Sequence, residues 1–221
     1  MGADIRSKTQ ARRKVLLISQ PNTPGLQSIP NAKNETDEIL VRLTSHDVEV
    51  LSLEGRVAVI SRVQQEIMSY NWIHLACHAI QDTQHPLKSG FHLHDGRMEL
   101  NQIITLRIPS ADFAFLSACQ TSAGDEKLSE EAVHLAGGML AAGYRGVVGT
   151  MWSIVDKYGP EVSKEFYVHL LRKEVGQQDG DGLDSADAAY ALDHATRLLR
   201  DKLGYSEEAL LTWVPYVHFG L

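Results

Sequence analysis

Cysteine is scarce in this 221-residue sequence, which contains only Cys77 and Cys119. Two cysteines are too few for a small secreted fold held together by disulfides, and they are typical of a reducing compartment. Long apolar runs are also missing: no stretch approaches the roughly 18 residues that a membrane-spanning helix needs, and the N-terminus lacks the apolar core of a signal peptide. We therefore expect a cytoplasmic protein that does not enter a membrane.

Basic residues are in the minority, because 21 Lys and Arg face 28 Asp and Glu and give a formal net charge of -7. Affinity for nucleic acid depends on clustered Lys and Arg, so this balance argues against a general nucleic-acid binder. The length and the 43% of hydrophobic residues suit one large domain. We interpret residues 1–14 as a flexible basic tail and residues 15–221 as the domain.

Short apolar runs alternate with segments of helical periodicity along most of the chain. Connections that contain a helix join parallel strands, so the pattern predicts an α/β fold with a mostly parallel sheet. The expected strands are 15–18, 48–53, 72–77, 113–119 and 147–151; the expected helices are 32–43, 57–67, 129–142, 160–173 and 185–203; and a β-hairpin on the turn Asp95-Gly96 is expected over 91–100.

His78 and Cys119 fall at the carboxyl ends of two consecutive expected strands. In a parallel α/β sheet the functional crevice lies outside those ends. A Cys/His pair is sufficient for acyl transfer, because the imidazole accepts the thiol proton, the thiolate attacks a carbonyl and the imidazolium protonates the leaving amine. The alternative is equally open from the pair alone: a small buried cysteine and an ordinary polar histidine.

The residues around Cys119 favour the catalytic interpretation. Ala118-Cys119-Gln120 overlaps the nucleophile signature of caspases, in which the histidine also lies upstream by a similar distance. Ser117 replaces the Gln of that signature, and Thr121 replaces its Gly.

Several motifs taken together, in this order, resemble the CHAT domains, which are caspase-like peptidase domains often found behind TPR or similar repeats. The resemblance covers roughly residues 15–221. The matching segments are His74-Leu75-Ala76-Cys77-His78, Leu116-Ser117-Ala118-Cys119-Gln120-Thr121, 143–152, Val155-Asp156, Glu165-Phe166-Tyr167 and 213–220.

The resemblance implies a caspase-like three-layer sandwich, with a mostly parallel central sheet and helices on both faces. It implies a cysteine endopeptidase with His78 as general base and acid and Cys119 as nucleophile, needing no cofactor or metal. The backbone N–H groups of Cys119 and Ala79 are expected to form the oxyanion hole. Many relatives have Gly after the histidine, and Ala79 disfavours the positive φ that Gly permits.

The resemblance also bears on substrates and partners. We expect a protein or peptide substrate, a role in regulated proteolysis or cell-death-like signalling, and an N-terminal sensor or repeat module in a longer parent chain. Ser117, two residues before the nucleophile, is expected to line the substrate pocket. Trp152 is expected either to wall that pocket or to pack under its own loop, and Asp156 either to attract a basic side chain or to start a helix near Pro160.

Two other functions compete with the peptidase. One is a catalytically silent CHAT-like protein-interaction domain. The other is a metal-dependent hydrolase that uses His78, His92 and His94, although exposed hairpin histidines are the better interpretation of the last two. His74 and Cys77, inside an expected strand, are interpreted as core residues.

Overall fold

The computed structural model describes residues 13–82, 84–120, 132–172 and 183–221, apart from the side chains of 118–120 and 132–134. The strands of this part of the chain form one sheet with the order β2-β1-β3-β6-β7-β8. All neighbours on this path are parallel except β7 and β8. The strands are β1 (Lys14–Ser19), β2 (Glu49–Glu54), β3 (Trp72–Ile80), β6 (Phe113–Gln120), β7 (Gly146–Thr150) and β8 (Tyr216–Gly220).

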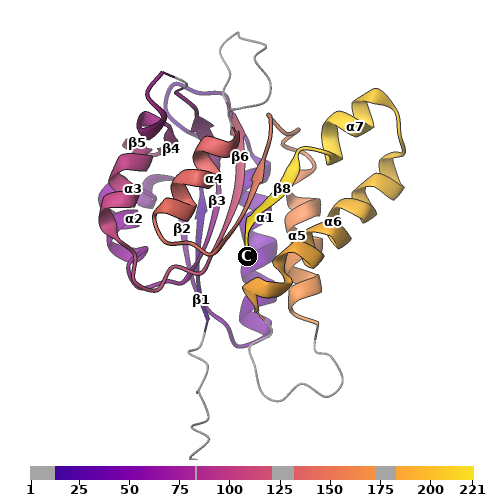
Figure 1. The fold of residues 1–221 in the computed structure, drawn as a ribbon, viewed down its shortest axis with the longest axis horizontal. Helices are drawn as coiled ribbons and strands as arrows, with labels where there is room; N and C mark the ends of the chain where they lie inside the picture. Colours follow the sequence, from indigo (N-terminus) through magenta and orange to yellow (C-terminus); the bar gives the residue numbers. More distant parts are fainter. Residues whose placement is uncertain (1–12, 83, 121–131, 173–182) are drawn as a thin grey trace, which may run out of the picture.

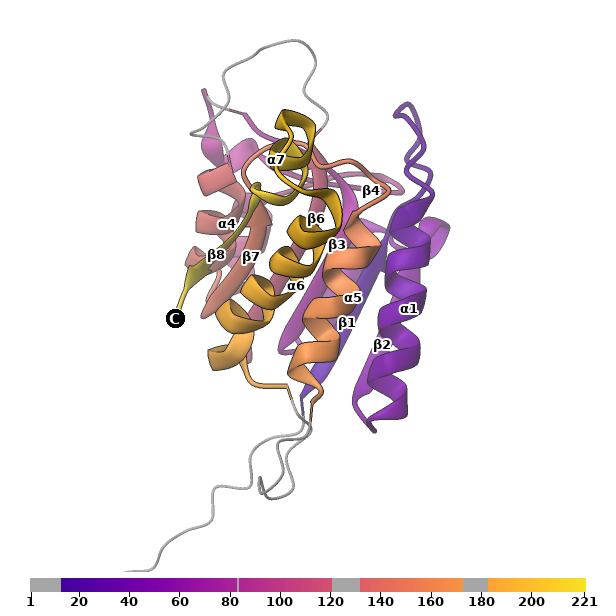
Figure 2. The same cartoon turned by 90° about the vertical axis from the view of Figure 1, so that its right-hand side faces the viewer.

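Helices cover both faces of the sheet (Figures 1 and 2). One face packs against α2 (Ile60–Glu66), α3 (Leu100–Leu106) and α4 (Ala132–Ala141). The opposite face, which we call the α5 face, packs against α1 (Asn31–Ser45), α5 (Gly159–Leu170) and α6 (Ala188–Leu203). The predicted α/β class, with a mostly parallel sheet between two helical layers, is confirmed.

β1 shows why its short apolar run forms a central strand. Successive side chains of a strand point to opposite faces. Leu16 and Ile18 belong to the core beside α2 and α4, whereas Val15 and Leu17 belong to the core on the α5 face. All four side chains are fully buried, so the strand has to be apolar on both faces.

The predicted hairpin is present as β4 (Gly90–Leu93) and β5 (Gly96–Glu99), and β4 pairs with β3. Leu93 pairs with Gly96, so the turn consists of His94 and Asp95, one residue earlier than expected. The carboxylate of Asp95 accepts a hydrogen bond from the backbone N–H of Ile60 at the start of α2 (2.9 Å), which favours this turn because it satisfies a helix-terminal donor.

Three elements were missing from the sequence interpretation: α3, α7 (Glu207–Trp213) and β8. The two helices are each 7 residues long, too short to give a clear apolar periodicity. Their capping contacts were the available signals. Gln102 Oε1 accepts from the Glu99 backbone N–H at the start of α3, and Ser206 Oγ accepts from the Ala209 N–H in α7.

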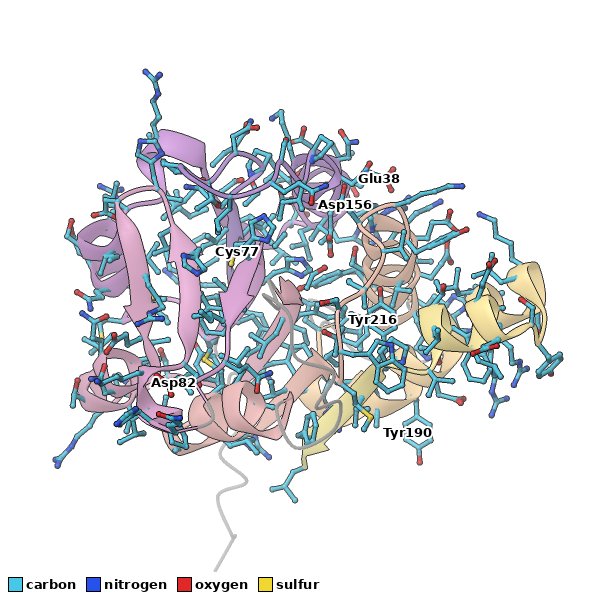
Figure 3. The ribbon with its side chains drawn as sticks, turned by 90° about the horizontal axis from the view of Figure 1, so that it is seen from above. Glu38, Cys77, Asp82, Asp156, Tyr190 and Tyr216 are labelled. Atoms are coloured by element: carbon cyan, nitrogen blue, oxygen red, sulfur yellow. The ribbon has the colours of Figure 1, made fainter. Side chains whose placement is uncertain are left out.

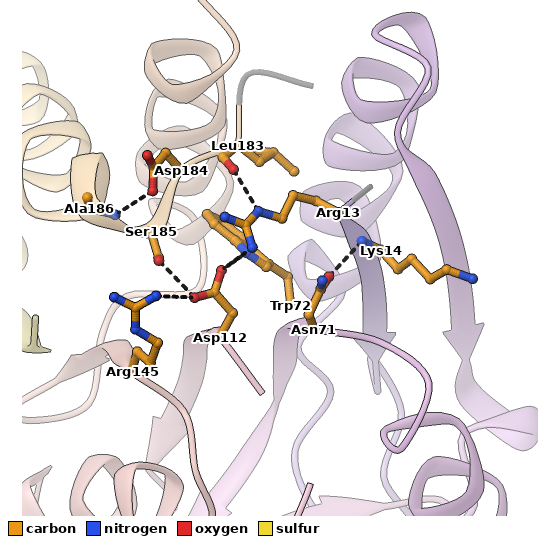
Figure 4. Close-up of polar contacts among 10 residues, drawn as sticks. All are labelled: Arg13, Lys14, Asn71, Trp72, Asp112, Arg145, Leu183, Asp184, Ser185 and Ala186. Carbon is orange, nitrogen blue, oxygen red and sulfur yellow. Dashed lines mark hydrogen bonds and ion pairs between the residues drawn. The ribbon is translucent and has the colours of Figure 1, made fainter. Parts of the chain in front are cut away.

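Asp112 forms a buried polar cluster at the amino ends of the central strands (Figure 4). Its Oδ2 accepts a hydrogen bond from Trp72 Nε1 (2.9 Å) and pairs with the Arg13 guanidinium (3.1 Å), and its Oδ1 accepts from Ser185 Oγ (2.9 Å). The cluster thus joins β3, β6 and the segment before α6. Arg13 and Lys14 are part of the folded structure, whereas residues 1–12 of the expected tail lie outside the described residues.

Within the described ranges, no helix combines the length and the apolar character that crossing a membrane requires.

Candidate active site

His78 and Cys119 are brought side by side by the parallel pairing of β3 with β6. The register of the two strands matches His78 with Cys119, two positions before the end of β3 and one before the end of β6. These carboxyl ends lie at the end of the sheet that is seen in Figure 3. The Cys119 side chain lies outside the described residues, so the backbone register is the observation that joins the pair.

The face on which His78 lies follows from its neighbours. Cys77 and Ala79 both belong to the core beside α2 and α4, so His78, between them, points to the α5 face. Only 4% of His78 is exposed. A histidine buried to this degree needs specific partners for its ring nitrogens.

One ring nitrogen of His78 has such a partner. Nε2 lies 2.7 Å from the backbone carbonyl oxygen of Gln27. A carbonyl only accepts hydrogen bonds, so Nε2 carries a proton. In the neutral ring the other nitrogen, Nδ1, then holds the lone pair, and it has no hydrogen-bond partner among the described residues. The contact with Gln27 therefore selects the tautomer in which Nδ1 is the base.

The segment between β1 and α1 places the Gln27 carbonyl beside β3. The N–H of Gln20 donates to Ala76 O (2.9 Å), and the N–H of Ile29 donates to Pro21 O (2.9 Å), which closes the segment on itself. The side chain of Ile29 is buried against Ala76 and Ala32. These contacts fix both ends of the segment that contains Gln27.

Below the dyad, a carboxylate is buried on the same face of the sheet. Glu35, on α1, is 3% exposed, and its Oε1 lies 3.0 Å from His74 Nε2. Its other oxygen accepts a hydrogen bond from Ser117 Oγ (2.9 Å), and Tyr167 OH lies 3.4 Å from His74 Nδ1. Burial and the negative charge of Glu35 raise the pKa of Tyr167 far above its ordinary range, so this residue stays a neutral phenol.

The model of the CHAT domain family matches residues 3–221. This chain belongs to the CHAT domain family. A solved structure with the same fold is that of the Arg-specific cysteine proteinase gingipain R, which matches 94% of this chain with a TM-score of 0.59 at 11% identity. The chain corresponds to 46% of the gingipain chain, and an identity this low shows the fold alone. A search of curated proteins found no match. The caspase-like fold expected from the sequence is confirmed.

Ala79, which follows His78, lies in unstrained backbone in this CHAT domain. Its side chain is fully buried in the core beside α2 and α4, and its backbone pairs with Phe91 on one side and Gln120 on the other. Ala79 is not among the non-glycine residues with positive φ, which in the described chain are Asp47 and Arg107. The methyl group is therefore accommodated, and the contribution of the Ala79 N–H to an oxyanion hole stays a prediction.

The other three predicted substrate-binding residues of this CHAT domain all have partners within the fold. The hydroxyl of Ser117 is buried and bonded to Glu35. Trp152 Nε1 donates to the backbone oxygen of Leu211 in α7 (2.9 Å), and this favours the packing interpretation. Asp156 Oδ2 accepts from Asn31 Nδ2 (2.7 Å) and from the Asn31 N–H (3.3 Å), so it caps α1 and not the helix near Pro160 (Figure 3). Pocket roles for these residues stay predictions.

His92 lies closer to the dyad than a hairpin residue was expected to lie. The pairing of Ala79 with Phe91 makes His92 the next neighbour of His78 across β3 and β4. Burial, with smaller effects of the charges on Arg97 and His78, lowers the pKa of His92. In the part of the chain that the structure describes, no group of three or more His, Cys, Asp or Glu residues could hold a metal, so the His78, His92 and His94 set receives no support.

His74 and Cys77 are fully buried, as interpreted from the sequence. His74 nevertheless has a polar role, because it binds Glu35. Sequence reasoning missed Glu35 and the carbonyl of Gln27. A backbone carbonyl leaves no signal in the sequence. Glu35 did leave one: it lies with Ala32, Thr36 and Ile39 on the buried face of α1, where a charged residue requires a partner.

Proposed function

We propose that this CHAT domain is a cysteine endopeptidase in which Cys119 is the nucleophile and His78 the general base and acid. The observation that carries the proposal is the register pairing of His78 with Cys119 at the carboxyl ends of β3 and β6. Neighbouring strands are about 5 Å apart, and paired positions of parallel strands share one face, which is the placement that a Cys/His dyad requires.

The contact of His78 with Gln27 determines which ring nitrogen acts as the base. With Nε2–H bonded to the Gln27 carbonyl, Nδ1 accepts the thiol proton of Cys119, and the carbonyl stabilises the resulting imidazolium. The thiolate attacks the carbonyl carbon of a peptide bond, and Nδ1–H of the imidazolium protonates the leaving amine. Water then hydrolyses the thioester with His78 again as base. Backbone N–H groups beside the nucleophile stabilise the oxyanion, and the steps use neither a metal nor an organic cofactor.

The substrate in this proposal is a protein or peptide, and the cleavage serves regulated proteolysis or cell-death-like signalling under a sensor or repeat module N-terminal to the domain. Its support is the CHAT family, whose members often follow such repeats. Gingipain R is described as Arg-specific. Asp156 is the acidic residue that we assign to a corresponding preference here, although its carboxylate also caps α1.

A peptide-library cleavage profile tests the proposal. Wild-type protein is compared with Cys119→Ala, and Cys77→Ala is the control because it removes the other cysteine, which faces the opposite core. We expect Cys119→Ala to fold, shown by circular dichroism, and to lose at least about a thousandfold in cleavage rate, the loss typical for a deleted nucleophile. Cleavage that survives in Cys119→Ala would show that Cys119 is not the nucleophile.

One observation favours the second candidate, a silent interaction domain: His78 is only 4% exposed, which restricts access to its ring. The two functions separate by thiol chemistry. In an active dyad the imidazole lowers the pH midpoint for alkylation of Cys119 below the ordinary thiol pKa of about 8.5. In a silent domain we expect the midpoint to stay at that value. A wild-type midpoint at the ordinary value, with no cleaved peptide, supports the interaction domain.

A further inference from the structure

Glu35 has a buried carboxylate on the α5 face, and the proposed mechanism gives this carboxylate no role. Burying a charge is costly unless hydrogen bonds compensate for the lost water. Glu35 has that compensation from two different strands, through His74 on β3 and Ser117 on β6. A residue on α1 is thus bonded to both strands that carry the dyad.

The residues around Glu35 leave space for its carboxylate and supply donors to it. At Gly159, the first residue of α5, a Cβ would lie 3.0 Å from Glu35 Oε2 and 3.3 Å from Ser117 Oγ, so any larger residue would crowd both groups. The hydrogen bonds also agree in direction. Ser117 and His74 Nε2 donate to Glu35, and the neutral phenol of Tyr167 donates to the remaining His74 nitrogen. Three elements besides α1 therefore contribute to one satisfied network.

The network lies directly behind the dyad on the same strands. His74 precedes His78 by four residues and Ser117 precedes Cys119 by two, which at about 3.3 Å a residue is about 13 Å and 7 Å along the strands. The helix that carries Glu35 also follows directly after the segment that holds Gln27, the partner of His78. A shift of α1 against the sheet would therefore move one end of the segment that holds the Gln27 carbonyl.

We propose that Glu35 is a positioning residue for the His78/Cys119 dyad: by bonding α1 to His74 and Ser117, it fixes the Gln27 carbonyl that orients His78 and the strand that carries Cys119. This inference rests on the proposed function, since it assigns Glu35 a role in that same reaction. Glu35 itself does not contact the reacting atoms.

The hydrogen bonds that each variant can still form predict how strongly it disturbs the network. Glu35→Ala removes both acceptors and leaves the Ser117 hydroxyl and His74 Nε2 without the partner that each has in the wild type. Glu35→Gln restores the network if His74 changes tautomer, because the amide then accepts from Ser117 and donates to Nε2, while Nδ1–H donates to Tyr167. Leu43→Ala is the matched control: Leu43 is fully buried, two turns further along the same face of α1, and is not bonded to the network.

The test measures iodoacetamide alkylation of Cys119 as a function of pH in the full chain, with mass spectrometry to separate Cys119 from Cys77. We expect a wild-type midpoint below the ordinary thiol value of about 8.5, and a midpoint in Glu35→Ala that moves about one pH unit toward it, with roughly tenfold slower alkylation below the midpoint. Glu35→Gln should lie between the two, and Leu43→Ala should keep the wild-type midpoint although it lowers the unfolding temperature.

The outcomes separate the two proposals. A low wild-type midpoint that Glu35→Ala shifts no more than Leu43→Ala does overturns the positioning role and leaves the peptidase intact. An ordinary midpoint in the wild type, with no peptide cleaved, overturns both. If Glu35→Ala does not fold, the comparison is made with Ser117→Ala, which removes the bond between Glu35 and the strand of Cys119, and a midpoint that is unchanged in Ser117→Ala then counts against the positioning role.

Discussion

The Nε2 atom of His78 donates a hydrogen bond to the backbone carbonyl oxygen of Gln27, across 2.7 Å. The acceptor belongs to the backbone, so no side-chain substitution at Gln27 removes it. Its position depends on Ile29, which anchors the segment against Ala76. The orientation of His78 can therefore be tested through an apolar residue.

Ile29→Ala should slow alkylation of Cys119 at pH 7 about tenfold. A less firmly packed segment weakens the hydrogen bond from His78 to the Gln27 carbonyl, and this bond stabilises the imidazolium that activates the thiol. The change itself costs about 2–5 kcal/mol of stability as a buried Ile→Ala substitution. Ile67→Ala is a control of the same kind in the core on the opposite face. Equal alkylation rates in the two variants would mean that the segment does not control His78.

Trp152→Phe should lower the free energy of unfolding by about 1 kcal/mol, because it removes the hydrogen bond to Leu211 O and keeps most of the ring. Faster amide hydrogen exchange in α7 should accompany the loss, measured by mass spectrometry. An unchanged α7 together with a raised KM for peptides would instead support the pocket-wall interpretation of Trp152.

Asp156→Ala should destabilise the fold by about 1 kcal/mol, since two donors of Asn31 at the start of α1 lose their acceptor. Asp156→Asn keeps an acceptor oxygen but removes the charge, so it should retain most of the stability in a urea titration. The same variant tests specificity: selective loss of cleavage after Arg and Lys would show that the carboxylate also attracts basic side chains.

Asp112→Ala should cost about 3 kcal/mol in chemical denaturation, because Trp72 Nε1 and Ser185 Oγ lose their partner in a buried site and Arg13 loses its counter-charge. The cluster lies at the amino ends of the strands, opposite His78. The pH midpoint of Cys119 alkylation should therefore be the same as in the wild type. A shifted midpoint would show that the two ends of the sheet are coupled.

His218 should make the protein less stable in acid. Burial lowers the pKa of His218, whose Nε2 lies against Gly146 and whose ring stacks on Phe113. The unfolded chain binds the proton more readily, so stability falls as the pH decreases below the ordinary value of about 6.5 and continues to fall toward the lower folded-state pKa. His218→Phe should flatten the decline in unfolding temperature between pH 7.5 and 5. A decline as steep as in the wild type would assign it to other groups.

The pattern of apolar runs was sufficient to place His78 and Cys119 at the ends of successive buried strands, because a strand buried on both faces has to be apolar throughout. The short sequence motifs around both residues then indicated the family and, with it, the fold. The short helices α3 and α7 escaped, since 7 residues give too few turns for a periodicity.

The sequence by itself determined the class of fold and the strands that carry His78 and Cys119, because these depend on local patterns of burial and on short motifs. Only the tertiary structure decided the register that pairs His78 with Cys119, the tautomer selected by Gln27, and the partners of Ser117, Trp152 and Asp156. Each of these is a contact between residues far apart in the chain, and its geometry is set by how helices pack on a sheet, which no local pattern encodes.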